Sequence, residues 1–189
     1  MREQFRQYII RLYQDIPAEI YEGLLSLFFI GAVGIIVYYG WKSGWKTVVG
    51  LLLVEYVFFI YCSTVVCRKA SESVDGHNFS PFWSYEAIKN GKEDLIEENI
   101  MNVVVFVPVG LLLGLVTLKL RNGWRTQIAR ILLIVGTELM ISGSIEALQY
   151  FSKRGFSELD DVFHNTIGCL IGLMIIMLIE RIWLLLKRY

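Results

Sequence analysis

The sequence is poor in charge and has no excess of either sign. Charged residues make up only 19% of the 189 positions, and 18 Lys and Arg balance 18 Asp and Glu. Soluble domains carry about 25% charged residues on average. Proteins that bind nucleic acid usually show a basic excess, so we expect no nucleic-acid partner. Long disordered segments are equally unexpected, because aromatic residues reach 14%.

The common catalytic and metal-binding motifs are also missing. There is no nucleophile elbow, zinc motif or phosphate-cradling glycine loop. The three cysteines, Cys62, Cys67 and Cys169, have no paired or metal-ligand spacing, so we interpret them as structural. We expect no signal peptide, because no small-residue cleavage motif follows a short apolar core. These absences argue against ordinary hydrolases and leave a carboxylate-based site open.

Long apolar runs dominate what is present. They cover residues 23–41, 47–67, 100–118, 131–150 and 162–179. Their only charged residues are Glu55, Glu138 and Glu146. Each run is long enough to cross a hydrocarbon core of about 30 Å as a helix. A soluble protein with five buried helices would need polar helix faces that these runs lack. The sequence therefore predicts an all-α, polytopic membrane helix bundle with about five transmembrane helices.

The N-terminal segment, residues 1–19, has a different pattern. Phe5, Tyr8, Leu12 and Ile16 fall on one helical face, away from the arginines. This pattern predicts an amphipathic helix in the membrane interface, or a leader helix packed on another part of the protein. We accordingly divide the chain into this helix and a transmembrane domain, residues 20–189.

Charge gives the topology only weakly. With five spans, nine Lys and Arg fall on each side of the membrane. The set on the C-terminal side lies in shorter segments with little acid, which favours a cytoplasmic C-terminus. The longest connection, residues 68–99, contains the aromatic stretch 78–85, and we expect that stretch to lie on the membrane surface.

Polar residues gather where the third span begins, the fourth ends and the fifth begins. Because the chain crosses alternately, these three places share one membrane face. Helical spacing puts the polar residues on one stripe of each span, and in spans three and five the stripe continues into glycines. Small residues allow close helix approach, and polar ones can meet across the interface. The candidate site residues are Asn102, Glu146, Gln149, Arg154, Asp160, Asp161, His164 and Asn165.

Each residue type suggests a role in this predicted polar pocket. Glu146, Asp160 and Asp161 are the candidate catalytic residues if the protein is an enzyme, and together they could bind a divalent cation. Arg154 could clamp a carboxylate or a phosphate. His164 lies one turn after Asp160 and could share a metal with it or face the surface.

The neutral and deeper polar residues complete the hypothesis. Asn102, Gln149 and Asn165 would supply neutral hydrogen bonds, and Pro108 would free a backbone carbonyl and open span three locally. Glu55 and Glu138 lie deeper in the spans, where a carboxylate is costly, and are either functional or hold helices together.

Four ordered motifs resemble the VanZ-like family. The first is Asn78-Phe-Ser-Pro-Phe82, and the second is Asn102-Val-Val-Val-Phe-Val-Pro-Val-Gly110. The third is Ile145-Glu-Ala-Leu-Gln149, and the fourth runs from Arg154-Gly-Phe156 to Gly168 through Asp160, Asp161 and Asn165. The resemblance covers about residues 75–175. It implies a multi-pass protein of the bacterial plasma membrane, in a family named for a member associated with teicoplanin resistance.

The resemblance and the pocket together give a functional hypothesis. We expect a protein that contributes to glycopeptide resistance or envelope homeostasis through an outward-facing pocket for a lipid-linked or anionic head group. Its partners would be the lipid bilayer and a lipid-linked cell-wall precursor or a lipoglycopeptide. The alternatives are a small transporter or flippase, in which Glu138 carries charge, and a membrane enzyme with a carboxylate general base. The ligand, the cation and the oligomeric state stay open.

Overall fold

The computed structural model describes residues 17–68, 76–118 and 123–187. Their elements, in chain order, are α2 (Ala18–Tyr39), α3 (Trp41–Tyr61), the π-helical turn η1 (Cys62–Val66), β1 (His77–Asn78), α4 (Trp83–Lys89), α5 (Asp94–Val116), α6 (Trp124–Ser152), β2 (Ser157–Glu158) and α7 (Leu159–Leu186). Five of these helices are long and apolar enough to cross a membrane. The predicted all-α bundle with five spans is therefore confirmed. The predicted N-terminal interfacial helix lies outside the described residues.

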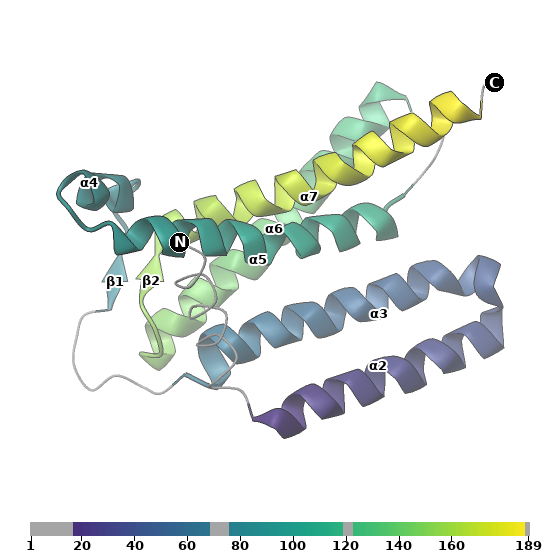
Figure 1. Cartoon of the computed structure of the whole chain (residues 1–189), viewed down its shortest axis with the longest axis horizontal. Helices are drawn as coiled ribbons and strands as arrows, with labels where there is room; N and C mark the ends of the chain where they lie inside the picture. Colours follow the sequence, from purple (N-terminus) through teal and green to yellow (C-terminus); the bar gives the residue numbers. More distant parts are fainter. Residues whose placement is uncertain (1–16, 69–75, 119–122, 188–189) are drawn as a thin grey trace.

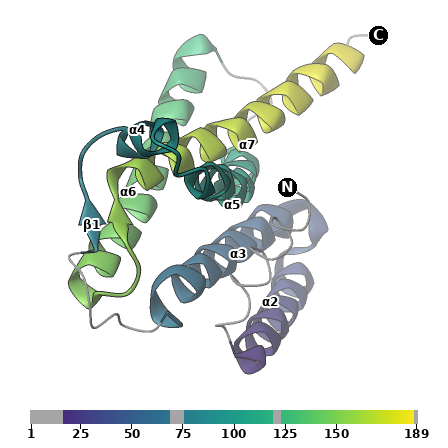
Figure 2. The same cartoon turned by 60° about the vertical axis from the view of Figure 1, so that its left-hand side comes forward.

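The helices form a hairpin beside a three-helix group. The antiparallel helices α2 and α3 run alongside α5, α6 and α7 (Figures 1 and 2). Helix α2 packs on α3, α3 packs on α5, and the most extensive contact joins α5 to α7. We call the end where α5 begins, α6 ends and α7 begins the motif side. Helix α4 and both strands lie there, at the left of Figure 1.

The lipid-facing exterior explains why hydropathy located the spans. Large apolar side chains stay exposed along the helices, as at Phe29 (69%), Met140 (70%) and Leu178 (61%). A soluble protein rarely exposes such contiguous apolar surface, whereas lipid is a good solvent for it. The buried core between the helices includes Phe106, Val109, Ile134, Ile145 and Leu173.

Glycines set the close contact between α5 and α7, as their stripes predicted. A Cβ atom on Gly168 would lie 2.1 Å from the carbonyl oxygen of Val103, and one on Gly110 would lie 1.9 Å from that of Cys169. Because no side chain fits at these distances, the two backbones can approach only through glycine. This contact brings the polar start of α5 against the polar start of α7.

One connection and the helix that contains Pro108 differ from the sequence-based prediction. Gly40, with φ +70°, ends α2 and starts α3 directly, so residues 42–46 are helical and do not form a loop. Lys46 extends from α3 and donates a 2.6 Å hydrogen bond to the carbonyl of Leu118 beyond the end of α5. Pro108 does not interrupt α5, which is continuous through it.

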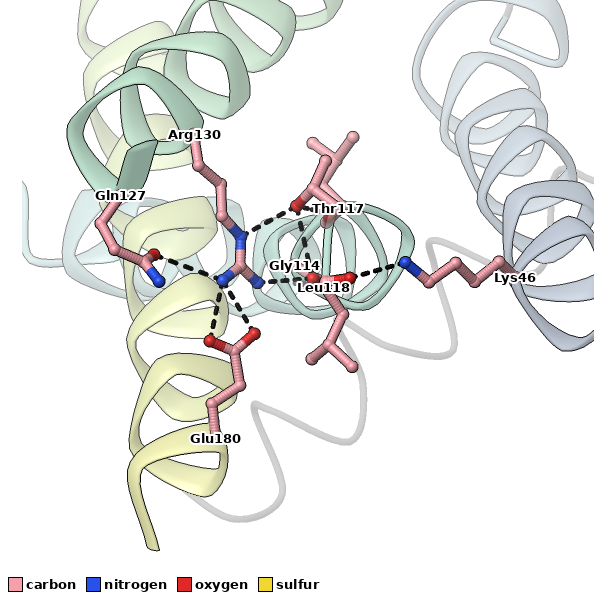
Figure 3. A network of polar contacts seen from close by, with 8 residues as sticks. Lys46, Gly114, Thr117, Leu118, Gln127, Arg130 and Glu180 are labelled. Atoms are coloured by element: carbon pink, nitrogen blue, oxygen red, sulfur yellow. Dashed lines mark hydrogen bonds and ion pairs between the residues drawn. The ribbon is translucent and has the colours of Figure 1, made fainter. Parts of the chain in front are cut away.

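A buried polar network holds the opposite side of the bundle together (Figure 3). Arg130 of α6 pairs with Glu180 of α7, and its Nη1 lies 2.8 Å from Oε1. It also donates to the Thr117 hydroxyl at 3.0 Å and to the Gly114 carbonyl at 2.6 Å. Arg130 directly precedes the apolar run 131–150, and because α6 begins at Trp124, it is helical and lies against α5 and α7.

Candidate functional site

A short parallel strand pair folds the long connection back onto the start of α7. Residues His77 and Asn78 of β1 pair with Ser157 and Glu158 of β2. The pair brings the 78–85 segment, which the sequence placed on the membrane surface, beside the N-terminus of α7. Strands of two residues are too short to give a periodic signal in the sequence.

Asp160 fastens this segment to α7. Its carboxylate accepts hydrogen bonds from the backbone N–H of Phe82 at 2.5 Å and of Ser84 at 2.9 Å, and from the Ser84 hydroxyl at 2.6 Å. Phe82 itself has φ +61°, an unfavourable conformation for a bulky side chain. Asp160 is 2% exposed. Its oxygens are therefore occupied by the connection that leads into α4.

A polar cavity of about 60 Å³ opens among η1, α5, α6 and α7 on the motif side. It brings together five of the sequence-predicted residues, namely Asn102, Glu146, Gln149, Asp161 and Asn165. Three other predicted residues, Arg154, Asp160 and His164, are not among those that line it. The remaining lining residues are Ile60, Thr64, Arg68, Glu98, Val105, Phe106, Ile145 and Phe156.

Hydrogen bonds fix the side chains around this cavity. Asn102 of α5 donates to the Asp161 carboxylate of α7 at 2.7 Å. Glu146 of α6 accepts the backbone N–H of Glu158 at 2.8 Å, which ties the end of α6 to β2. Asn165 donates to the hydroxyl of Ser142 at 2.8 Å. Each bond joins two different elements, so the cavity wall depends on the tertiary fold.

Arg68 and Glu98 line the cavity, and the sequence analysis did not select either one. Glu98 lies one helical turn before Asn102, so extending that stripe would have found it. Arg68 follows η1 in the long connection, where periodicity gives no information. A Cβ atom on Gly155, which has φ +97°, would lie 2.8 Å from Arg68 Nη1. The Arg154-Gly155 turn therefore leaves room for the Arg68 guanidinium.

Arg154 acts on the segment that carries Arg68. Its Nη1 donates a 2.8 Å hydrogen bond to the carbonyl of Val66, the last residue of η1. Gln149 donates to the carbonyl of Thr64 in the same turn, at 3.2 Å. Single π-helical turns are often found at functional sites. These two bonds hold η1 and the following Arg68 against the end of α6.

Glu158 lies in β2, in the connection between α6 and α7, and does not line the cavity. Burial raises its pKa to about 8, and the nearby Asp161 carboxylate acts in the same direction. A hydrogen bond of 2.8 Å from the Trp83 indole N–H opposes this shift without cancelling it. Burial, reinforced by the neighbouring carboxylates, therefore keeps the Glu158 carboxyl group largely protonated at neutral pH.

His164 and the carboxylates of the predicted cation site do not form one cluster. His164 is buried, and its Nε2 lies 2.9 Å from the Tyr85 hydroxyl of α4. Within the described residues, no three His, Cys, Asp or Glu side chains are grouped closely enough to hold a metal ion. Because Asp160 bonds to the 82–84 segment, it does not join Glu146 and Asp161 in one ligand set. The geometry thus gives no support to a cation at these three carboxylates.

Glu138 lies deeper on the same helix as Glu146. It is fully buried, and its Oε2 accepts a 2.6 Å hydrogen bond from Thr166 of α7. Among the described residues its Oε1 has no hydrogen-bond partner. A lone carboxyl group in this position is costly for a membrane protein unless it is neutral or has a function.

A comparison with models of known protein families shows which family this chain belongs to. A model of the VanZ/LLP1 family matches residues 27–180, which covers most of the five spans and every residue of the cavity. The chain belongs to the VanZ/LLP1 family. The VanZ-like resemblance of the four motifs is therefore confirmed. No curated protein and no solved structure gives a significant match. This VanZ/LLP1 protein is a membrane protein, and all residues that line its polar cavity lie within the matched region.

Proposed function

We propose that this VanZ/LLP1 protein recognises the head group of a membrane lipid or lipid-linked envelope precursor in its polar cavity. Recognition would contribute to envelope homeostasis and to protection against teicoplanin-type lipoglycopeptides. The cavity carries the proposal, because it places one guanidinium, three carboxyl groups and three amides inside an otherwise apolar bundle. Polar side chains in a membrane bundle are expensive and are functional candidates for that reason.

The cavity residues divide into three roles. Arg68 takes the role that the sequence assigned to Arg154, which is to hold the anionic part of the head group. Glu146 and Asp161 orient the head group or accept its protons. Asn102, Gln149 and Asn165 supply neutral hydrogen bonds. Arg154 keeps a supporting role by fixing η1, and Asp160 and His164 hold α4 over the site.

The proposed role requires the motif side to face outward. This agrees with the distribution of basic residues, which favours a cytoplasmic C-terminus in a bacterial plasma membrane. Reporter fusions after Arg125 and after Lys187 test this orientation, since both positions lie on the side opposite the cavity. A cytoplasmic reporter should be active at both, and an external reporter at neither. The reverse pattern would contradict the outward orientation.

Conservative variants test the function itself. We expect Arg68→Gln, Glu146→Gln and Asp161→Asn each to abolish lipoglycopeptide protection in a host that expresses the protein, while membrane abundance stays near normal. Glu86→Gln, on the exposed face of α4, is the matched control and should keep full protection. Full protection by all three cavity variants would refute the proposal.

A transport role is the second candidate, and Glu138 favours it. Its buried carboxyl group lies on the helix of Glu146 but farther from the motif side, where a proton could be carried. Transport predicts that Glu138→Gln abolishes protection as fully as Glu146→Gln does. A site that works only from the motif side predicts that Glu138→Gln keeps most of it.

A further inference from the structure

Two buried amide oxygens in the cavity lack hydrogen-bond donors. In the part of the chain that the structure describes, neither Gln149 Oε1 nor Asn165 Oδ1 has a partner. Gln149 is 4% exposed and Asn165 is 5% exposed, and both line the cavity. Their amide nitrogens are already bonded, to the Thr64 carbonyl and to the Ser142 hydroxyl. The Thr64 carbonyl can only accept, so it fixes the orientation of the Gln149 amide and leaves Oε1 as a free acceptor. Asn165 donates to the Ser142 hydroxyl, and its Oδ1 is then the second free acceptor. Buried acceptors in native proteins are almost always paired, so a ligand with N–H or O–H groups is expected here.

The charges around these oxygens favour a cationic donor. The cavity is lined by the carboxyl groups of Glu98, Glu146 and Asp161 and by the guanidinium of Arg68. The ion pair that the described residues form is the one between Arg130 and Glu180. In this part of the chain, none of the three carboxyl groups forms an ion pair with Arg68. A positive group on the ligand would thus meet amide oxygens and carboxyl groups together. Arg68, which forms no salt bridge in the described part of the chain, can meet a negative group on the same ligand.

The size of the cavity limits the ligand further. With about 10–15 Å³ needed for one water, a volume of about 60 Å³ holds on the order of five water-sized groups. An ethanolamine-sized amine fits this space, whereas a sugar ring or a peptide does not. Glu146 also borders a second hollow of about 320 Å³ on its other side, with Gly143, Ala147 and Val162 in its wall. The second hollow is mostly apolar and lies between the end of α6, β2 and the start of α7, with Phe79 also in its wall.

We propose that the cavity binds the primary ammonium group of an aminophospholipid, with Gln149 Oε1 and Asn165 Oδ1 as acceptors. Glu146 and Asp161 supply the opposite charge, and Arg68 holds the phosphate of the same head group. The lipid chain lies along the apolar hollow beside Glu146. This inference rests on the proposed function and names the class of lipid that the site takes.

Native mass spectrometry of the delipidated full-length protein tests the inference with three lipids. Phosphatidylethanolamine carries the ammonium donor, phosphatidylcholine has the same charge without N–H groups, and phosphatidylglycerol has hydroxyl donors and a net negative charge. We expect phosphatidylethanolamine to bind about tenfold more tightly than phosphatidylcholine, the loss expected for charge-assisted hydrogen bonds that cannot form. Equal binding of these two lipids, or a preference for phosphatidylglycerol, would overturn the inference.

Variants of the two amides test the same inference on the protein side. The double variant Gln149→Met and Asn165→Leu should lose the preference for phosphatidylethanolamine, whereas Thr137→Val on α6, which does not line the cavity, should keep it. If the double variant does not fold, the lipid comparison on the unmodified protein decides alone.

The two proposals fail in different ways. Selective binding of phosphatidylethanolamine without any effect of the cavity variants on lipoglycopeptide protection would contradict the proposed function and leave the ammonium site standing. Loss of protection in the cavity variants, with equal binding of all three lipids, would contradict the ammonium site alone.

Discussion

Arg130 and Glu180 form an ion pair with an N–O distance of 2.8 Å, and their side chains are only 4% and 8% exposed. The pair joins α6 to α7 on the side opposite the cavity, and Arg130 adds bonds to the end of α5 (Figure 3). One guanidinium therefore connects the three helices that form the cavity. The cavity lies at the other end of the same helices.

Breaking the pair should destabilise the bundle strongly. Glu180→Ala leaves a buried guanidinium without its counter-charge, and such losses cost about 3–5 kcal/mol. The measurement is the free energy of unfolding in detergent micelles. Arg181→Ala, at the exposed neighbouring position, is the matched control and should change little. The double variant Arg130→Met and Glu180→Leu should recover part of the loss, because it removes both charges. A double variant less stable than Glu180→Ala would contradict this account.

Replacing a contact glycine should separate α5 from α7. In Gly168→Ala the new methyl group meets the Val103 carbonyl at 2.1 Å, so the backbones must move apart. We expect a loss of about 1–3 kcal/mol in the free energy of unfolding. Gly136 of α6 has no atom within 4 Å of the added Cβ, and Gly136→Ala should be neutral or slightly stabilising. Equal effects of the two substitutions would count against glycine-mediated packing.

The free energy of unfolding should decrease as the pH rises from the ordinary pKa of Glu158, 4.5, to its pKa in the folded protein, about 8. Its pKa is about 8 in the folded protein, above the ordinary value of 4.5, so the folded state binds more protons between these values. The stabilisation is fully present below pH 4.5 and is lost as the pH rises through 8. One such group contributes at most about 1.4 kcal/mol per pH unit. Unfolding at pH 5 to 9 should show a shallower slope in Glu158→Gln, and an unchanged slope in the exposed control Glu86→Gln.

The sequence could predict the spans and much of the cavity because both follow from helical spacing. Runs without charge locate helices in lipid, since the backbone must satisfy its own hydrogen bonds there. Alternate crossing then placed Asn102, Glu146 and Asp161 at one membrane face, and the cavity contains all three. The glycine stripes predicted the close contact of α5 with α7 for the same reason. These features need no knowledge of how the connections fold.

The features that the sequence did not reveal depend on those connections. Arg68 lines the cavity because η1 and the turn at Gly155 position it there. Neither η1 nor this turn produces a periodic pattern in the sequence. Asp160 does not line the cavity, because the strand pair brings the backbone N–H groups of Phe82 and Ser84 to its carboxylate. Arg130 and Glu180 flank the apolar runs 131–150 and 162–179, and the structure buries both of them because α6 and α7 extend beyond these runs.

The neighbours Asp160 and Asp161 should respond differently to the same substitution. Asp160 accepts three hydrogen bonds from the 82–84 segment, while Asp161 accepts one from Asn102 and lines the cavity. Asp160→Ala leaves buried backbone N–H groups unpaired, and the loss of bonds to a charged acceptor should cost at least about 1.5–3 kcal/mol. It should also speed amide hydrogen exchange in α4, because that helix is no longer fastened to α7.

Asp161→Ala should instead leave the fold nearly intact and affect binding. It removes a carboxylate that Glu146 and Glu98 repel, which offsets the lost bond to Asn102. Hydrogen exchange in α4 should then match that of the unmodified protein, while binding of phosphatidylethanolamine and lipoglycopeptide protection are lost. Faster exchange in α4 with Asp161→Ala, or unchanged exchange with Asp160→Ala, would contradict the division of roles between these two carboxylates.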